Sequence, residues 1–269
     1  MRNIKAVFKK QLISYFKNPE RWLMPAIFLF LPFLFVTSNP DIPRTLMPIQ
    51  FVIMFVGISM IGSTAGIILE DRRTMNLRFM SMAGVKSWQY LIATCGVMLL
   101  VSLGVLFLFG LIKGHTGIIM INFLIVTMLG AICSMLLGIT ISLSKFAPFT
   151  MIVALILGVG PVLAVDFGVD ALSQIFYFTH TYQINVALRG GAATLPQATT
   201  IDELANVYNI HDMTELFYFI RELNTPSDLA LFPIGPVRVL LINIGVILLA
   251  FIGMNTFYGL DGERKTKQE

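Results

Sequence analysis

Six long stretches of this chain carry almost no charge, and they constrain its fold more than any other feature. A helix needs about 20 apolar residues to cross the hydrocarbon core of a bilayer. The stretches are residues 22–38, 46–69, 88–112, 117–143, 146–165 and 236–260, and the only charge within them is Arg238. The first is the shortest. We expect Pro25 and Pro32 to break it as a helix. A tilt, or an extension into residues 19–21, would supply the length that it lacks as a span.

The overall composition excludes a soluble globule. Hydrophobic residues make up 56% of the chain and charged residues only 13%, whereas about a quarter of an average soluble domain is charged. Disorder is excluded as well, because it requires low hydrophobicity and high charge. Cys95 and Cys133 both lie inside apolar stretches, so neither a disulfide framework nor a metal cluster is expected. The sequence therefore predicts a single all-α membrane domain with six transmembrane helices over residues 1–269.

The basic residues lie mainly on one side of these stretches. Residues 1–22, 70–87, 144–148 and 261–269 hold 14 of the 19 Lys and Arg residues, but only six of the 15 acidic residues. Because Lys and Arg in short loops stay on the cytoplasmic side, we expect both termini to be cytoplasmic in a multi-pass protein of the cell membrane.

Residues 1–20 have the pattern of an amphipathic elbow helix lying on a membrane surface. Apolar residues recur there at helical spacing: Ile4, Val7, Phe8, Leu12 and Tyr15. The lysines between them would face anionic headgroups: Lys5, Lys9, Lys10 and Lys17. A merely basic tail is the alternative.

Residues 166–235 form a long external segment. Residues 171–188 are aromatic-rich but too polar to span, which favours an interfacial or re-entrant helix that lines a cavity. Residues 190–200 have the composition of a flexible connector. Residues 201–223 again show helical spacing, with Thr200 and Glu203 placed as a capping box. We expect a re-entrant segment followed by an external helical cap.

The inner loop of residues 70–87 is the most informative short segment. It carries two acids and four basic residues, with Leu77, Met80 and Met82 among them, then Gly84 at an expected turn and Trp88 opening the next stretch. This pattern predicts a short amphipathic helix across the inner face. An ordinary basic loop with solvated charges is the alternative reading.

Catalytic chemistry is hard to place in this sequence. The second to fifth stretches hold no Asp, Glu, Lys, Arg or His, which argues against a proton-coupled carrier. The chain has no G-x-x-x-x-G-K-[ST] phosphate loop. His115, His180 and His211 lack metal-ligand spacing, although His180 falls where it could line a cavity. We therefore expect no enzyme activity, cofactor or metal site in this chain.

Two small-residue motifs bear on helix packing. Gly62 and Gly66 form a GxxxG, which either lets helices approach closely or arises by chance. Gly158, Gly160 and Pro161 should kink or break the fifth stretch.

With these features in order, the whole chain resembles a permease subunit of the ABC-2 family of ATP-binding-cassette transporters. That family has an elbow helix, six spans, a coupling helix between the second and third, and re-entrant helices between the fifth and sixth. In the inner loop the matching positions are Glu70, Arg72, Thr74, Leu77, Met80, Ser87 and Leu91, and residues 176–191 resemble the re-entrant region. The chain departs from the pattern at Arg73, at Ala83 and Gly84, and at His180.

The resemblance implies two copies of a separate ATPase subunit, which would bind ATP and Mg, and a second permease subunit. Nucleic acid is not an expected partner. The residues that would couple to the ATPase are Glu70, Arg72, Arg73, Thr74, Leu77, Arg78 and Met80. In this family the second and fifth spans line the route between subunits. The candidates for that route are Ser59, Ser63, Thr64, Thr150 and Gly158, with His180 from the re-entrant segment.

The function expected from this resemblance is export of an amphipathic or lipophilic substrate, such as a drug, an antimicrobial peptide or a lipid. Export of a glycan or of sodium is an alternative within transport. A membrane sensor or immunity subunit that binds an external peptide through its cap is an alternative from another class.

Overall fold

The computed structural model describes residues 2–38, 49–144, 147–166, 170–188 and 234–258, which are almost entirely helical and contain no β-strand. The amino-terminal half contains α1 (Arg2–Lys17), α2 (Pro19–Ser38), α3 (Gln50–Met54), the π-turn η2 (Phe55–Ser59), α4 (Met60–Arg73), α5 (Asn76–Met82) and α6 (Ser87–Ile112). The remainder contains α7 (Gly117–Leu143), the 3-10 turn η3 (Ala147–Phe149), α8 (Thr150–Asp166), α9 (Asp170–Phe176), α10 (His180–Leu188) and α13 (Ile234–Tyr258).

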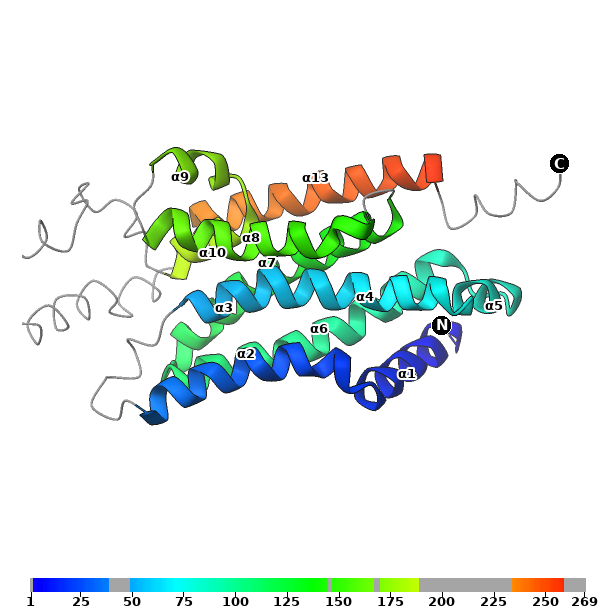
Figure 1. The fold of residues 1–269 in the computed structure, drawn as a ribbon, viewed down its shortest axis with the longest axis horizontal. Coiled ribbons are helices and arrows are strands. Elements are labelled where there is room, and N and C mark those ends of the chain that lie inside the picture. Colours follow the sequence, from blue (N-terminus) through cyan, green and yellow to red (C-terminus); the bar gives the residue numbers. More distant parts are fainter. Residues whose placement is uncertain (1, 39–48, 145–146, 167–169, 189–233, 259–269) are drawn as a thin grey trace, which may run out of the picture.

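Six helical rods form the body of the molecule. They are α2, the continuous rod α3–η2–α4, α6, α7, α8 and α13, and consecutive rods run in opposite directions (Figure 1). Four helices are long and apolar enough to cross a membrane: Gln50–Arg73, Trp88–Ile112, Gly117–Leu143 and Gly235–Ile252. Arg21–Leu34 and Ala147–Leu163 are shorter apolar helices. The chain is therefore an all-α protein with the character of a membrane protein.

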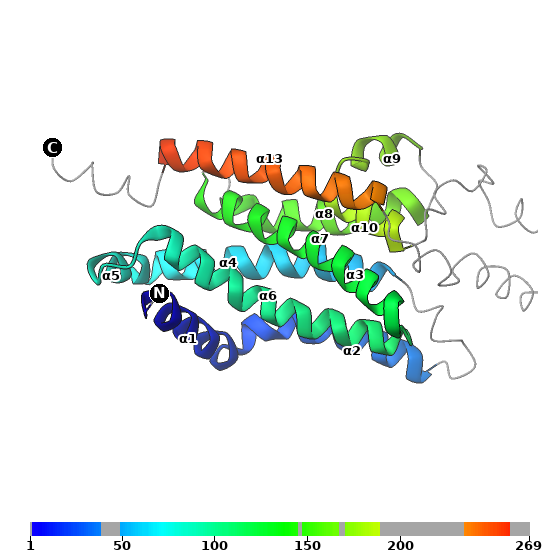
Figure 2. The ribbon, with the colours of Figure 1, turned by 180° about the vertical axis from the view of Figure 1, so that it is seen from behind.

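The two ends of the bundle differ. The helices α1 and α5 lie at one end, together with the start of α6 (Figure 1, Figure 2). At the opposite end lie α9, α10 and the start of α13. The external connector and cap predicted for residues 190–223 fall outside the described residues, as does the carboxy-terminal segment 261–269.

The prolines do not break their helices, although the sequence predicted a break at Pro25 and Pro32 and a kink or a break at Pro161. Helix α2 is continuous through Pro25 and Pro32, and α8 continues through Pro161. Helix α2 also begins at Pro19, in a position that suits proline because the first turn needs no N–H donor. Interior prolines are tolerated in membrane helices where neighbouring groups satisfy the backbone. Beside this proline, the Asn185 side chain of α10 donates to the Pro161 carbonyl at 3.5 Å and so ties α10 to α8.

The segment predicted as one re-entrant helix forms two short helices, α9 and α10. The backbone turns between them, where Thr179 N–H bonds to the Phe176 carbonyl. The hydroxyl of Thr179 accepts from the Tyr182 N–H and so caps α10. Helix α10 is almost wholly buried, packing against α13, α7, α8 and α3.

The central helix is α7, which packs most extensively on α4 and α13. Its glycines set the distance to its neighbours. A Cβ at Gly138 would lie 2.7 Å from the Ile61 carbonyl oxygen, and one at Gly130 would overlap the Ile184 side chain. Both cysteines are free, and the buried Cys133 thiol lies 3.6 Å from the Leu240 carbonyl.

A candidate coupling surface at the end that carries α1 and α5

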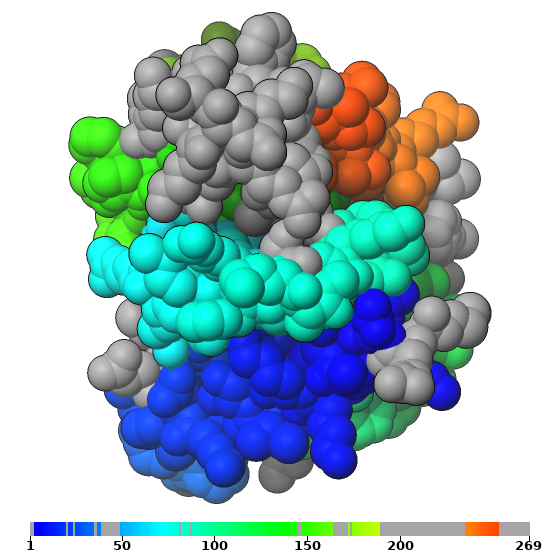
Figure 3. All heavy atoms as spheres, turned by 90° about the vertical axis from the view of Figure 1, so that its right-hand side faces the viewer, coloured from blue at the N-terminus to red at the C-terminus, as the bar shows by residue number. Residues whose placement is uncertain are grey.

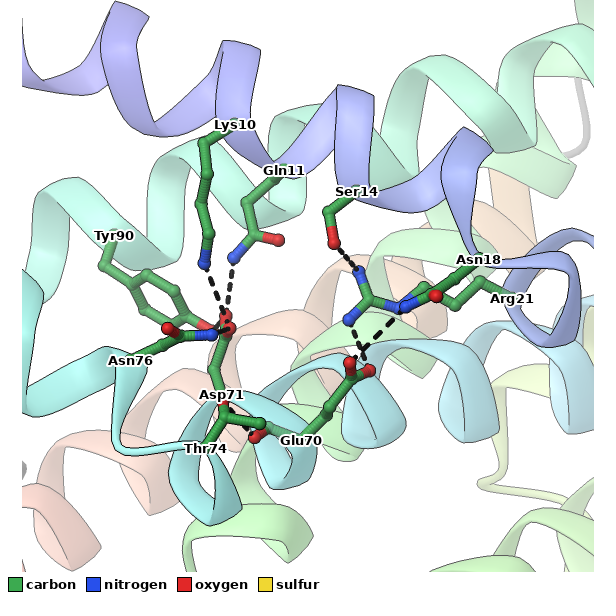
Figure 4. Close-up of polar contacts among 10 residues, drawn as sticks. All are labelled: Lys10, Gln11, Ser14, Asn18, Arg21, Glu70, Asp71, Thr74, Asn76 and Tyr90. Carbon is green, nitrogen blue, oxygen red and sulfur yellow. Dashed lines mark hydrogen bonds and ion pairs between the residues drawn. The ribbon is translucent and has the colours of Figure 1, made fainter.

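A buried carboxylate, Asp71, joins four helices at this end of the bundle. Asp71 lies in the last turn of α4 and is only 2% exposed. It accepts hydrogen bonds from Gln11 at 2.6 Å, Tyr90 at 2.8 Å, Asn76 at 3.0 Å and Lys10 at 3.1 Å (Figure 4). These donors come from α1, α5 and α6. One side chain of α4 therefore holds α1, α5 and α6 together.

The adjacent acid, Glu70, forms a second cluster with α1 and α2. Arg21 of α2 donates to Glu70 and, through its other terminal nitrogen, to the Ser14 hydroxyl at 3.0 Å (Figure 4). The Asn18 amide, between the two helices, adds a 3.4 Å contact to Glu70. Near this cluster burial raises the pKa of the Tyr15 hydroxyl to about 12, with Arg21 opposing the shift, so Tyr15 stays neutral.

These contacts correct one expectation about α1. The helix forms over residues 2–17 as predicted, and Val7 and Tyr15 are buried while Lys5 and Lys9 are exposed. Lys10, however, points to Asp71 and forms an ion pair with it instead of facing headgroups.

The turn between α4 and α5 is fixed by local hydrogen bonds. The Thr74 N–H and hydroxyl both bond to the Glu70 carbonyl, at 2.9 and 2.8 Å. Met75 then adopts a positive φ of 58°, which reverses the chain so that α5 can begin at Asn76. This is the short helix that the sequence pattern predicted. The turn expected at Gly84 is also present, with φ 78°.

Helix α5 has one face against the bundle and one exposed face. Leu77 and Met80 pack on a buried cluster that includes Ile68 and Tyr90. Figure 3 looks onto this end and shows the α4–α5 segment beside α1. We call the exposed residues the α5 surface: Arg72, Arg73, Met75, Arg78, Phe79 and Met82.

The α5 surface combines positive charge with large apolar side chains that are exposed to solvent. Phe79 and Met82 are 64% and 75% exposed. Arg72 also donates to the Ser142 carbonyl at 2.8 Å, which ties the surface to the end of α7. A partner with an apolar pocket and an acidic rim would complement this surface. A push on α5 would reach α1 and α6 through Asp71.

The residues predicted to line a translocation route lie mostly in the interior of the chain. Ser59, Thr64, Thr150, Gly158 and His180 are buried, and Ser63 is half-buried. The Thr150 hydroxyl donates to the Ala147 carbonyl in the preceding turn η3. The His180 Nε2 lies 2.7 Å from the Ser134 hydroxyl of α7, a partner that the sequence did not indicate. Their role in a route between subunits stays a prediction.

The GxxxG motif is not a packing site within the described chain. A Cβ at Gly66 would meet no described atom within 4 Å, and one at Gly62 would make an ordinary contact with the Met151 sulfur at 3.4 Å. Close approaches to the backbone of a neighbouring helix occur instead at Gly57, Gly138 and Gly158.

Sequence reasoning missed Gln11, Asp71 and Tyr90, although two of them carried a signal. Gln11 follows Val7 and precedes Tyr15 by one helical turn, so it shares their inward face. Asp71 likewise follows the buried Thr64 and Ile68 at helical spacing. A polar residue on an apolar face needs a partner, which predicts a buried hydrogen bond there.

A scan of family models, a search of curated proteins and a search of solved structures found no match to this chain.

Proposed function

We propose that this protein is the permease subunit of an ATP-binding-cassette exporter of the ABC-2 type. The support is the order and placement of its elements. An amphipathic helix precedes the first rod, a short helix joins the second and third rods at the same end, and two short helices join the fifth and sixth at the other end. That is the arrangement expected from the sequence resemblance. The six rods would be six membrane spans.

The observation that carries the proposal is the division of α5 into two faces. Leu77 and Met80 anchor it, whereas Arg78, Phe79 and Met82 are presented outward. An apolar face that the chain itself does not cover favours a docking site for another protein. In this proposal the partner is a cytoplasmic ATPase subunit, and ATP-driven movement of α5 would pull on α1 and α6 through Asp71.

The orientation follows from the same end of the molecule. Most of the described basic residues gather there, on α1, α2 and the α4–α6 segment, whereas Lys113 and Arg238 lie at the opposite end. Those at this end include Lys5, Lys9, Lys10, Lys17, Arg21, Arg72, Arg73, Arg78 and Lys86. The positive-inside rule would place this end in the cytoplasm of a cell membrane. The cargo would be amphipathic or lipophilic and would move through a dimer of permease subunits.

The test is to purify this protein from its native membranes in mild detergent, to look for an ATP-binding-cassette ATPase that co-purifies, and to measure ATPase activity and substrate movement in liposomes. We expect the ATPase to co-purify and its activity to rise in the complex. A permease that retains no ATPase under these conditions would contradict the proposal.

A matched pair of α5 variants sharpens this test. The double substitution Arg78→Ala and Phe79→Ala removes exposed side chains, so it should abolish ATPase binding while leaving the melting temperature unchanged. Leu77→Ala removes a side chain from the inward face and should lower the melting temperature. If the exposed-face variant still binds the ATPase as tightly as the wild type, α5 is not the docking helix.

A further inference from the structure

The π-turn η2 places one extra residue inside the rod from Gln50 to Arg73. The Met60 N–H bonds to the Phe55 carbonyl, five residues back, where an α-helix would bond four residues back. Such turns are rare and occur frequently at functional sites. This one lies between α3 and α4, and α4 carries both acids of the coupling site at its other end.

The neighbouring helices hold η2 in this shape through two glycines. A Cβ at Gly57 would lie 2.5 Å from the Cα of Gly158 in α8, so the two backbones touch directly. A Cβ at Gly158 would lie 2.4 Å from the side chain of Ile58. The same Cβ at Gly57 would lie 3.2 Å from the methyl carbon of Thr181 in α10. The π-turn is therefore specified by its packing as well as by its own sequence.

The hydroxyls around η2 are unsatisfied in this arrangement. Elsewhere in the described helices, Ser and Thr hydroxyls commonly bond to a carbonyl three or four residues back, as Thr127 does to Phe123 at 2.7 Å. The hydroxyls of Ser59, Thr64 and Thr181 are buried and have no such bond, nor any other partner among the described residues. Buried unpaired hydroxyls cost stability, so this register is not the best one for every side chain.

We infer that η2 is a register switch, in which the π-turn relaxes to α-helix and drives α4 forward by one residue. An α-helix advances about 1.5 Å and turns about 100° per residue. With α3 fixed, each residue of α4 would then move into the place that the next residue occupies now. Helix α4 would rotate about its axis as it moves toward the end that carries α5. Each side chain would then take the position of the side chain that follows it in the sequence.

The sequence of α4 suits this shift because neighbouring residues are chemically alike at three of its buried positions and at one exposed position. The exchanges would put like in place of like at four positions: Ser63 for Thr64, Ile67 for Ile68, Glu70 for Asp71 and Arg72 for Arg73. Gly66 would take the place of Ile67, so packing there would differ between the two states.

The adjacent acids Glu70 and Asp71 are the strongest support for this inference. In the present state the Asp71 carboxylate accepts hydrogen bonds from Gln11, Lys10 and Tyr90 (Figure 4). In the shifted state Glu70 would enter the same place, so these donors would keep a carboxylate partner. Buried donors that lost their acceptor would be costly, and Glu70 prevents that loss for the donors around Asp71. Leu69 would take the place of Glu70, so the Arg21 side chain would lose its present carboxylate partner in the shifted state. The switch is a property of this chain alone, and only its use in transport rests on the function proposed above.

Deletion of one residue tests the switch directly. Removing Ile58 removes the extra residue, so α3 and α4 can keep their present places as a regular helix. We expect this variant to insert and to melt near the wild-type temperature. Removing Ile132 from α7, which is α-helical throughout, should unfold the protein because no extra residue absorbs the loss. If the two deletions are equally damaging, the inference is wrong.

Cysteine crosslinking then reads the register in the full-length permease in liposomes, after Cys95 and Cys133 are replaced by Ala. Gln11→Cys is paired with Asp71→Cys, with Glu70→Cys or, as the control, with Arg72→Cys, and a short dithiol crosslinker is added. We expect the first two pairs to crosslink and the third to fail. In the Ile58 deletion, the Asp71 pair should persist and the Glu70 pair should fall to the level of the control.

Two results of the crosslinking would overturn the switch. One is a Glu70 pair that never exceeds the Arg72 control in the undeleted chain. The other is a Glu70 pair that crosslinks equally well after the deletion. Because no ATPase is present, these results are independent of whether one co-purifies, so failure of the switch and failure of the transport proposal can be told apart.

Discussion

At the scale of single residues, the determinant of this structure is how each buried polar group is satisfied. The Asp71 side chain is only 3% exposed, whereas Lys10, its ion-pair partner, is 41% exposed. A buried carboxylate needs several donors to offset its lost hydration, and Gln11, Asn76 and Tyr90 supply them. Lys10 adds less, because partly exposed ion pairs are weak.

Replacing the carboxylate should therefore be costly. Asp71→Ala leaves the Gln11 amide and the Tyr90 hydroxyl without an acceptor, so we expect a loss of about 2–4 kcal/mol in unfolding free energy. Denaturant unfolding in detergent measures it. Arg78→Ala, on an exposed side chain, should change stability by less than about 0.5 kcal/mol. Equal effects at the two positions would show that Asp71 is not a structural centre.

A second prediction at this scale concerns pH. His115, in the turn after α6, packs on Phe123 with ring centroids 5.3 Å apart. Burial, with a smaller effect of Lys113, lowers the pKa of His115 to about 4. The unfolded chain then binds more protons than the folded one, so His115 lowers stability as pH falls from about 6.5 to 4.

His115→Phe separates this effect from other titrations, because it keeps a ring beside Phe123 and removes the charge. The difference in melting temperature between wild type and variant should change only across that pH window. A constant difference between pH 7 and pH 4 would contradict the assignment.

At the scale of elements, close packing depends on where glycines lie more than on the motif they form. Gly57 touches the backbone of α8, whereas Gly66, which belongs to the GxxxG, meets no described atom. Whether a glycine permits close packing depends on whether a neighbouring helix passes directly beside it.

Alanine substitutions should separate these two glycines. Gly57→Ala places a Cβ 2.5 Å from the Gly158 Cα, so we expect a clear loss of stability because backbone cannot yield easily. Gly66→Ala should be neutral or stabilising by about 0.5–1 kcal/mol, since alanine favours helix. Unfolding in mixed micelles compares them. A destabilising Gly66→Ala would instead indicate that a partner packs there.

At the scale of the whole molecule, the two ends are chemically different. The end with α1 and α5 carries the buried Asp71, the half-buried Glu70 and most of the described basic residues. The opposite end presents apolar side chains at the α9–α10 turn, among them Phe178 at 71% exposure. Asn243 of α13 holds this turn through the Phe178 carbonyl at 2.9 Å.

Thiol labelling in intact cells tests which end faces outward. With Cys95 and Cys133 replaced by Ala, Phe178→Cys should react with a membrane-impermeant maleimide, and Met82→Cys should react only after permeabilisation. The reverse pattern would invert the topology argued from the positive-inside rule.

The sequence by itself determined that this is an all-α membrane protein, and it located α1, α5 and the turn at Gly84. The length of the uncharged stretches and the spacing of apolar residues are local properties, so they can be recognised directly in the sequence. Only the tertiary structure decided which polar residues meet. Gln11, Asp71 and Tyr90 are distant in sequence, and their partners depend on how helices pack. The same is true of the π-turn and of the intact proline-containing helices, because neighbouring helices supply the contacts that hold those backbones.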